Sequence, residues 1–216
     1  LTYTLPKYQL TCGIVDIFMH TIERYFTPVH GNELTDEIAE GLMRTLIRNA
    51  AKAYENQEDY DAMSEIMWCG SISHNGITGL GRPKDFLCHK LGHQLGAKFD
   101  EAHGATLSAV WGSWARYVYK TNPGRFALFG EKVFGIDASQ TSDSDITDTV
   151  LASITAWETW CHSIDMPTTL TELGIYPTDA QIEEMAEKCV FGRNGHIGFF
   201  QPLTKEDIVA ILQMAK

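Results

Sequence analysis

The sequence lacks several features that would assign it to common functional classes. No apolar run approaches the roughly 18 residues needed to cross a bilayer, and the N-terminal part has no basic segment followed by an apolar one, as a signal peptide would. Lysine and arginine total only 17 against 28 aspartate and glutamate residues, so the formal net charge is −11. Clustered cations, which nucleic acids and anionic membranes require, are missing. We therefore expect a soluble protein that binds neither.

Cysteine is scarce and unpatterned. The five residues are Cys12, Cys69, Cys88, Cys161 and Cys189. Their number is odd and no two form a C-x-x-C pair, so neither a disulfide framework nor a cysteine zinc site is indicated. This usage is typical of the reducing cytoplasm. The chain also starts at Leu1 rather than at methionine, and we expect it to be a processed or truncated piece of a longer protein.

Alternating patterns typical of β-strands are missing as well, and the apolar residues recur every three or four positions, as they do on one face of a helix. One such series predicts a helix over residues 35–55, and it consists of Leu34, Ile38, Leu42 and Leu46. A second series predicts a later helix, and it consists of Val150, Ile154, Trp157 and Cys161. The sequence therefore predicts an all-α fold, a multi-helix bundle of about eight or nine helices, with residues 1–216 forming a single domain.

Several residues mark expected helix starts. Capping boxes are predicted from two threonine pairs, Thr178 with Gln181 and Thr204 with Asp207. Pro83 and Pro123 are expected in the first turns of helices, where proline is best tolerated.

Asp16 and His20 are the first candidates for chemistry. Their i, i+4 spacing places a carboxylate and an imidazole on one helical face. The neighbouring residues are apolar, and a carboxylate in such a helix is costly to bury unless a cation compensates it. A divalent metal with the imidazole as a second ligand would do so. The alternative is a pair that faces water and is merely hydrogen-bonded.

A second segment carries three histidines. His89 and His93 share a helical face, and His103 follows an expected helix break near residues 99–101. A zinc metalloprotease would have glutamate directly after the first histidine, but Lys90 stands there. Gly92 in this segment is a poor helix former and indicates close approach of the backbone to another part of the protein. The cluster favours a metal site over three separately solvated side chains.

Four stretches together resemble a known family. They are residues 16–27, 66–68, 73–76 and 89–104, and they are similar to the iron-containing alcohol dehydrogenases, in particular the butanol-dehydrogenase-like branch. The resemblance runs through the whole chain but covers only the C-terminal, helical half of that family. The N-terminal α/β half, which binds the nicotinamide nucleotide on a glycine-rich turn, is expected to be absent, since no G-x-G-x-x-G motif occurs.

The resemblance implies a ligand set. Asp16, His20, His89 and His103 match the positions of the family's divalent-metal ligands. His93 matches a residue that is not a ligand but lies near the metal and the nicotinamide. We therefore expect His93 to be catalytic, as a proton carrier, and to contact the cofactor, with a purely orienting role as the alternative.

The resemblance also implies an activity. It predicts hydride transfer between a small alcohol or aldehyde and NAD(P)H, with Fe2+ or Zn2+ as Lewis acid, in a cytoplasmic homodimer. One carboxylate and three imidazoles suit either metal. Without a nucleotide-binding half, the 216 residues alone are expected to be inactive. The alternatives are a standalone metal-binding helical module without redox turnover, or a truncated fragment, while a metal-dependent hydrolase is disfavoured because no carboxylate stands as an obvious base beside the histidine pair.

For the remaining histidines and for the tryptophans we expect structural positions and no part in the chemistry, apart from one alternative for His74. His74 is expected to end a helix, with a supporting role at the metal site as the alternative. Surface positions are expected for His30, His162 and His196. Core or pocket-wall positions are expected for Trp111, Trp114, Trp157 and Trp160.

Overall fold

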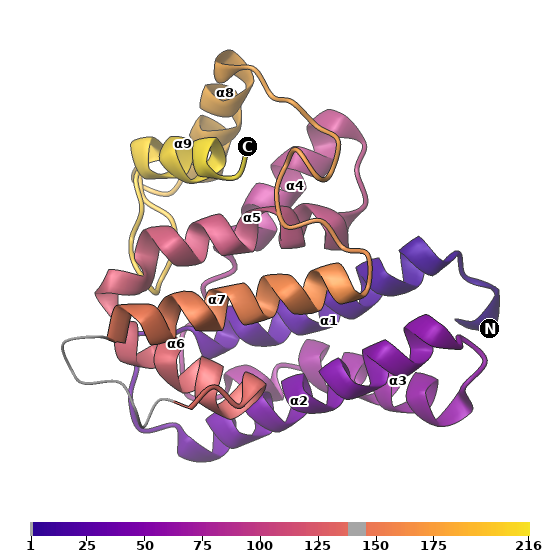
Figure 1. Cartoon of the computed structure of the whole chain (residues 1–216). Helices are drawn as coiled ribbons and strands as arrows, with labels where there is room; N and C mark the ends of the chain where they lie inside the picture. Colours follow the sequence, from indigo (N-terminus) through magenta and orange to yellow (C-terminus); the bar gives the residue numbers. More distant parts are fainter. Residues whose placement is uncertain (1, 138–145) are drawn as a thin grey trace.

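The computed structural model describes residues 2–137 and 146–216, and these residues form an all-α bundle (Figure 1). The α-helices are α1 (Lys7–Tyr25), α2 (Glu33–Glu55), α3 (Tyr60–His74), α4 (Leu87–Phe99), α5 (His103–Val118), α6 (Pro123–Phe129), α7 (Ile146–Ser163), α8 (Asp179–Val190) and α9 (Lys205–Met214). Short 3-10 turns lie at Thr2–Thr4, Ile77–Gly79 and Tyr119–Thr121, and a π-helical turn lies at Gly130–Phe134. Within the described residues the only bridge of β type joins Ile197 and Leu203. The predicted fold class is confirmed.

Most predicted helix positions are confirmed. The two capping boxes form as expected, at the starts of α8 and α9. Pro123 is the first residue of α6. The expectation for Pro83 is wrong, because α4 begins only at Leu87, after Phe86 has adopted a left-handed backbone conformation with φ of 54°. Leu34 does not join the core stripe of α2, since it is 74% exposed in the first turn of the helix.

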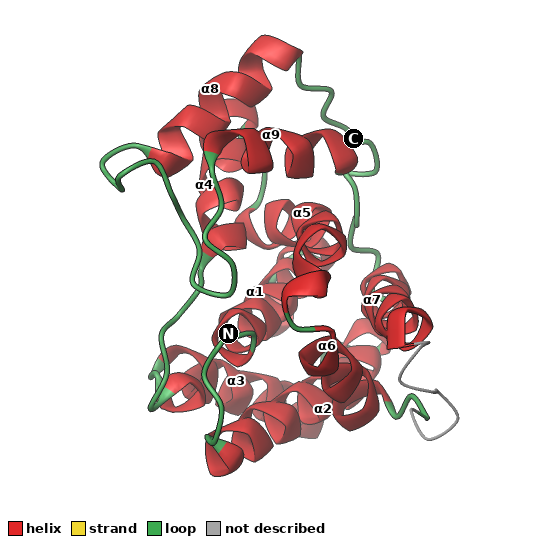
Figure 2. Cartoon of the chain, turned by 90° about the vertical axis from the view of Figure 1, so that its left-hand side faces the viewer, coloured by secondary structure: helices red, strands yellow, loops and turns green. Residues whose placement is uncertain are grey.

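Helix α1 runs through the middle of the bundle. It contacts α2, α3 and α5, and Figure 2 shows it lying between α3 and α5. Helices α2 and α3 pair with each other on one side, whereas α4 and α5 pair on the other. Helices α8 and α9 pack on α4 and α5 respectively. Side chains of α1 can therefore meet residues from α3, α4 and α5.

An aromatic cluster forms part of the core. Phe26, which follows α1, has its ring 4.3 Å from that of Phe126 and 5.8 Å from that of Trp114 (centroid distances). Trp111 and Trp157 pack together at 4.5 Å, so α5 and α7 are joined in the same core. The four tryptophans expected in the core are all buried. Large rings in offset or edge contacts bury much apolar area, and this stabilises the bundle around α1.

Two glycines allow the helices that carry the histidines to approach closely. A Cβ added at Gly104, the second residue of α5, would lie 2.0 Å from the backbone oxygen of Cys12 in α1. A Cβ at Gly92 in α4 would lie 2.9 Å from side-chain atoms of Thr106 and Leu107 in α5. The close approach expected at Gly92 is thus confirmed. These contacts fix α5 against both α1 and α4.

All five cysteines are buried and unpaired. Among the helices of the described ranges, none has the combination of length and apolar character needed to cross a membrane.

We expect Gly104→Ala to destabilise the chain by about 1–3 kcal/mol or more, because the new methyl group overlaps backbone that cannot move without shifting α1. Gly13→Ala is the matched control, since nothing lies within 4 Å of its added Cβ. Alanine is the better helix former, so this control should raise stability by about 0.5–1 kcal/mol. Urea unfolding followed by circular dichroism measures both. Equal effects of the two substitutions would contradict the proposed close approach.

Candidate metal centre

Helix α1 supplies the centre of the site. Asp16 and His20 lie one turn apart, with 3.8 Å between Asp16 Oδ1 and His20 Nε2. Their side chains are 24% and 21% exposed, whereas the residues that flank Asp16 in sequence are mostly core residues of α1. The structure therefore places the carboxylate between apolar residues of α1 and on the same face as His20, as the spacing predicted.

Helices α4 and α5 bring two more imidazoles to the same oxygen. His89 Nε2 lies 3.6 Å and His103 Nε2 lies 3.5 Å from Asp16 Oδ1. His103 is the first residue of α5, so the contact of Gly104 with α1 positions it directly. The side chain of His89 is only 5% exposed, while that of His103 is 38% exposed.

The polar atoms at this point fit a divalent ion. Asp16 Oδ1, His20 Nδ1 and His89 Nε2 are buried and have no hydrogen-bond partner. Buried polar atoms are normally paired, and unpaired ones call for an explanation such as an ion. Donor atoms around a tetrahedral zinc ion with bonds of about 2.1 Å are separated by about 3.4 Å. The separations of 3.5 and 3.6 Å from Asp16 Oδ1 are close to this value.

Two overlapping donor groups share Asp16. In one, donor atoms of Asp16, His89 and His103 all lie within 4.8 Å of one another, and in the other the same holds for Asp16, His20 and His74. The four residues matched to the family's ligands are therefore all at the site, but they are divided between the two groups.

Glu23 holds His89 in place. This carboxylate is 1% exposed and lies on α1, two turns beyond Asp16. Its Oε2 accepts a hydrogen bond from His89 Nδ1, and its Oε1 accepts one from the backbone N–H of Cys88 at 2.6 Å. When the ring is neutral, with Nδ1 donating to Glu23, the lone pair of His89 is on Nε2, which faces Asp16. A carboxylate that orients a metal-binding imidazole in this way is a common feature of metal sites.

Sequence reasoning missed Glu23. Its i+3 spacing from His20 and i+7 spacing from Asp16 place all three on one face of α1, and this was the available signal. Cys88, by contrast, is fully enclosed in the core, and its backbone N–H donates to Glu23.

His93 lies at the edge of the site. It is exposed, and its ring stacks on that of His103 with centroids 5.0 Å apart, while the distance to the His89 ring is 6.5 Å. Burial, followed by the charge of Lys90, lowers the pKa of His93. It belongs to neither donor group.

The pKa values of the imidazoles at the site are shifted in different directions. Burial, together with the neighbouring His89, lowers the pKa of His20 to about 3. Burial also lowers the pKa of His103. For His89 burial acts in the same direction, but Asp16 and Glu23 outweigh it and raise the pKa to about 9. Burial raises the pKa of Asp16, yet His89 and the other imidazoles outweigh it and hold that pKa below its usual range. In the ion-free protein the His89 ring, protonated near neutral pH, therefore lies beside two carboxylates, Asp16 and Glu23.

Phe86 packs against two of the histidines, and Asp85 anchors the start of α4. The Phe86 ring lies 4.7 Å from that of His89 and 5.3 Å from that of His20. Asp85 Oδ2 accepts hydrogen bonds from the backbone N–H groups of Phe199 and Phe200, each at 2.7 Å, so the loop before α9 is tied to the start of α4. Burial is the main reason that the pKa of Asp85 rises to about 6.

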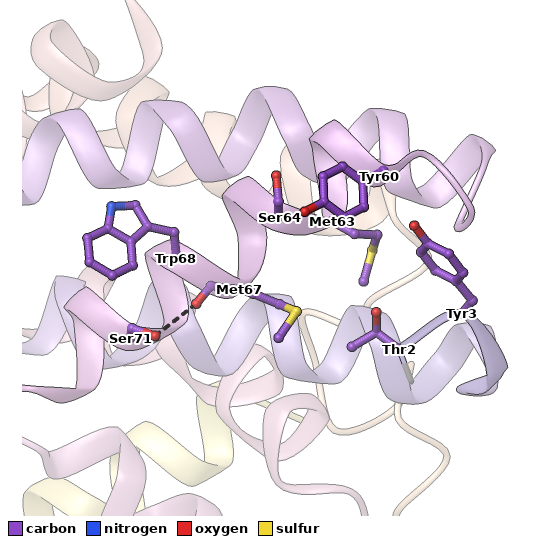
Figure 3. A pocket seen from close by; sticks show the side chains of 8 residues that line it. All are labelled: Thr2, Tyr3, Tyr60, Met63, Ser64, Met67, Trp68 and Ser71. Carbon is purple, nitrogen blue, oxygen red and sulfur yellow. Dashed lines mark hydrogen bonds between the residues drawn. The ribbon is translucent and has the colours of Figure 1, made fainter.

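A groove elsewhere on the surface lies apart from the histidines. It has a volume of about 610 Å³ and lies between the N-terminal turn and α3 (Figure 3). Its lining includes Tyr60, Met67 and Trp68 but neither Asp16 nor any histidine. This groove is therefore separate from the candidate metal centre.

Comparison with known proteins decides the family. Residues 11–216 match the family model described as "Fe-containing alcohol dehydrogenase family, C-terminal". The chain belongs to the iron-containing alcohol dehydrogenase family. NADH-dependent butanol dehydrogenase A of Clostridium acetobutylicum is 33% identical over 213 residues, which cover 98% of this chain and 53% of that protein. The NADPH-dependent aldehyde reductase YqhD of Escherichia coli is 34% identical over 174 residues, covering 81% of this chain and 44% of the reductase.

Solved structures of family members have the same fold. The substrate- and cofactor-free form of the E. coli aldehyde reductase YqhD superposes with a TM-score of 0.91 at 29% identity, and covers 100% of this chain and 55% of its own. Butanol dehydrogenase A of Thermotoga maritima gives a TM-score of 0.88 at 31% identity, with coverages of 99% and 53%. The chain thus spans about half the length of these iron-containing alcohol dehydrogenase relatives.

We expect the His89 imidazole of the ion-free protein to titrate near pH 9, and Glu23→Gln to move this titration to lower pH. The negative charge of Glu23 stabilises the protonated ring, so its removal favours the neutral form. Imidazole NMR of chelator-treated protein between pH 5 and 10 measures both. Glu40→Gln is the control, because Glu40 is equally buried but bonds to Tyr25. The assignment fails if the His89 titration is the same in the wild type and in Glu23→Gln.

Proposed function

We propose that this chain is the metal-binding, catalytic half of an NAD(P)H-dependent alcohol dehydrogenase. The observation that carries the proposal is the convergence of His89 Nε2 and His103 Nε2 on the unpartnered Oδ1 of Asp16. Asp16, His20, His89 and His103 would hold one Fe2+ or Zn2+ ion, since one carboxylate and several imidazoles suit either metal. Family membership and the names of the relatives support the choice of reaction.

The ion, when bound, would supply Lewis-acid polarisation of an alcohol or aldehyde oxygen. The residues of this chain have separate tasks around it. Asp16 offers a single negative charge, so a divalent ion would keep a net positive charge. Glu23 directs the lone pair of His89 towards the ion. The Phe86 ring packs against both His20 and His89 and so helps to orient these two imidazoles.

His93 is proposed to carry the proton of the substrate alcohol. Its ring stacks on His103 at the exposed edge of the site, so it can exchange protons with solvent. An imidazole is suited to this task near neutral pH. We also propose that His93 contacts the nicotinamide, which would be held by a nucleotide-binding half outside this chain.

The substrate is proposed to be a small alcohol or aldehyde, consistent with the butanol dehydrogenases and the aldehyde reductase among the relatives. Since five buried, unpaired cysteines suit a reducing compartment, we infer a cytoplasmic protein, and by family resemblance a homodimer. Because the nucleotide site would lie elsewhere, the isolated 216 residues should bind metal without turnover.

The first test is metal binding. We expect the wild-type chain to bind one Zn2+ or Fe2+ ion, and Asp16→Ala to lose it, because Asp16 is the only residue common to both donor groups. Equilibrium dialysis followed by elemental analysis gives the stoichiometry. His196→Ala is the control, since this exposed histidine lies in a loop and its ring contacts the backbone oxygen of Asn194. A wild type without bound ion, or an Asp16→Ala variant that binds normally, would overturn the proposed function.

The second test concerns His93. In a chain that also carries a nucleotide-binding half, we expect His93→Ala to keep its metal content and to lower kcat by about 10²-fold, which is typical for losing a positioned acid or base. Steady-state kinetics and metal analysis on the same preparation measure the two effects. Loss of metal would make His93 a ligand instead, and unchanged turnover would remove it from the mechanism.

A further inference from the structure

His74 lies beside the carboxylate oxygen of Asp16 that does not face His89 and His103. It is the last residue of α3, and its side chain is 44% exposed. Its Nε2 is 3.4 Å from Asp16 Oδ2, the oxygen that does not face His89 and His103. The rings of His74 and His20 are 3.9 Å apart. Helix α3 therefore contributes a donor atom to the site from a third direction.

Local hydrogen bonds set the orientation of the His74 ring. Its Nδ1 lies 2.9 Å from the backbone oxygen of Gly70, one turn earlier. A carbonyl oxygen only accepts, so Nδ1 must be the donor in this contact. Ser73 Oγ, 2.7 Å from Nδ1, already donates its own hydrogen to the same Gly70 oxygen, so it can only accept from the ring. The neutral ring thus has its lone pair on Nε2, which faces Asp16.

In the neutral form, His74 Nε2 and Asp16 Oδ2 are both hydrogen-bond acceptors, so neither can donate to the other. Two acceptors 3.4 Å apart are compatible when a cation lies beside both. Asp16, His20 and His74 provide two imidazoles and one carboxylate, all within 4.8 Å of one another. Two histidines and one carboxylate are a common ligand set for Fe2+ with open coordination positions.

We propose that His74 is a further donor to the divalent ion held by Asp16, on the side of the carboxylate oxygen Oδ2. The inference rests on the proposed function only in assuming that Asp16 binds an ion. His74 then adds to the four residues implied by the family resemblance. Its role differs from that of Glu23, which acts on the ion only through His89.

The test uses Co2+ and Zn2+ alone as probes, with the chelator-treated chain and without nucleotide. We expect His74→Ala to bind Zn2+ at least about tenfold more weakly, since even residues that only support a ligand change affinity by 10- to 100-fold. We also expect the visible absorption of bound Co2+ to change, because it depends on the number and kind of donors. Competition with a coloured chelator gives the affinity.

A second variant separates a donor from a hydrogen-bonding neighbour. His74→Gln keeps a side-chain amide that can donate a hydrogen bond to Asp16 but is a poor metal ligand. If His74 is a donor to the ion, both variants lose affinity and change the Co2+ spectrum. If His74→Gln restores the wild-type values, His74 only orients Asp16 and the inference is wrong. Thermal unfolding of the ion-free variants checks that each is folded, as expected for so exposed a side chain.

Failure of this inference is distinct from failure of the proposed function. His74→Ala with wild-type affinity and an unchanged Co2+ spectrum overturns the role of His74 alone, provided that Asp16→Ala abolishes binding. His196→Ala serves again as the control, and it should leave both quantities unchanged.

Discussion

The contact between α5 and α1 at Gly104 is the constraint on which the candidate site depends. The backbone of Gly104 packs so closely on that of Cys12 that no side chain fits between them. His103 precedes this contact by one residue on α5, and Asp16 follows it by one turn on α1. The distance from His103 to Asp16 is therefore set by backbone packing and not by a flexible loop. Gly92 lets α4 pack equally closely on α5, and this packing fixes the position of His89 on α4.

Electrostatics then explain why the apolar face of α1 tolerates a carboxylate. In the ion-free protein the proton on His89 lies between Asp16 and Glu23, and its raised pKa expresses the attraction of both. A divalent ion at this place would bring two positive charges, so its binding would displace the proton of His89. Burial and the neighbouring His89 lower the pKa of His20, so this ring is neutral near pH 7 and could act as a ligand.

Local spacing predicted the parts of this arrangement that lie within one helix. The pairing of Asp16 with His20, the two capping boxes and the helical stripes all follow from periodicity, because neighbours on a helix are fixed by its geometry. Contacts between helices could not be read in this way. Glu23 meets a histidine 66 residues further on, and the position of His74 beside Asp16 depends on how α3 packs on α1. The family resemblance supplied His89 and His103 as partners of Asp16, but spacing alone did not.

The errors have local physical causes. Pro83 does not start a helix, because Asp85 is engaged with the backbone of Leu87 and with the loop at 199–200, and Phe86 turns the chain through a left-handed conformation before α4 begins. Leu34 fits the periodicity of α2, but the first turn of that helix leaves it in solvent. Periodicity reports which side chains share a face, whereas burial depends on whether another element covers that face.

The uneven exposure of the imidazoles indicates the direction from which a substrate would reach the ion. The side chain of His89 is 5% exposed and Glu23 is buried. The side chains of His74 and His103 are 44% and 38% exposed, and His93 stacks beside His103. An alcohol and a nicotinamide ring would therefore reach the proposed ion most directly past these exposed rings. The residues proposed to carry the proton and to add a donor lie at this exposed part of the site, while His89 and Glu23, which fix its geometry, lie in the interior.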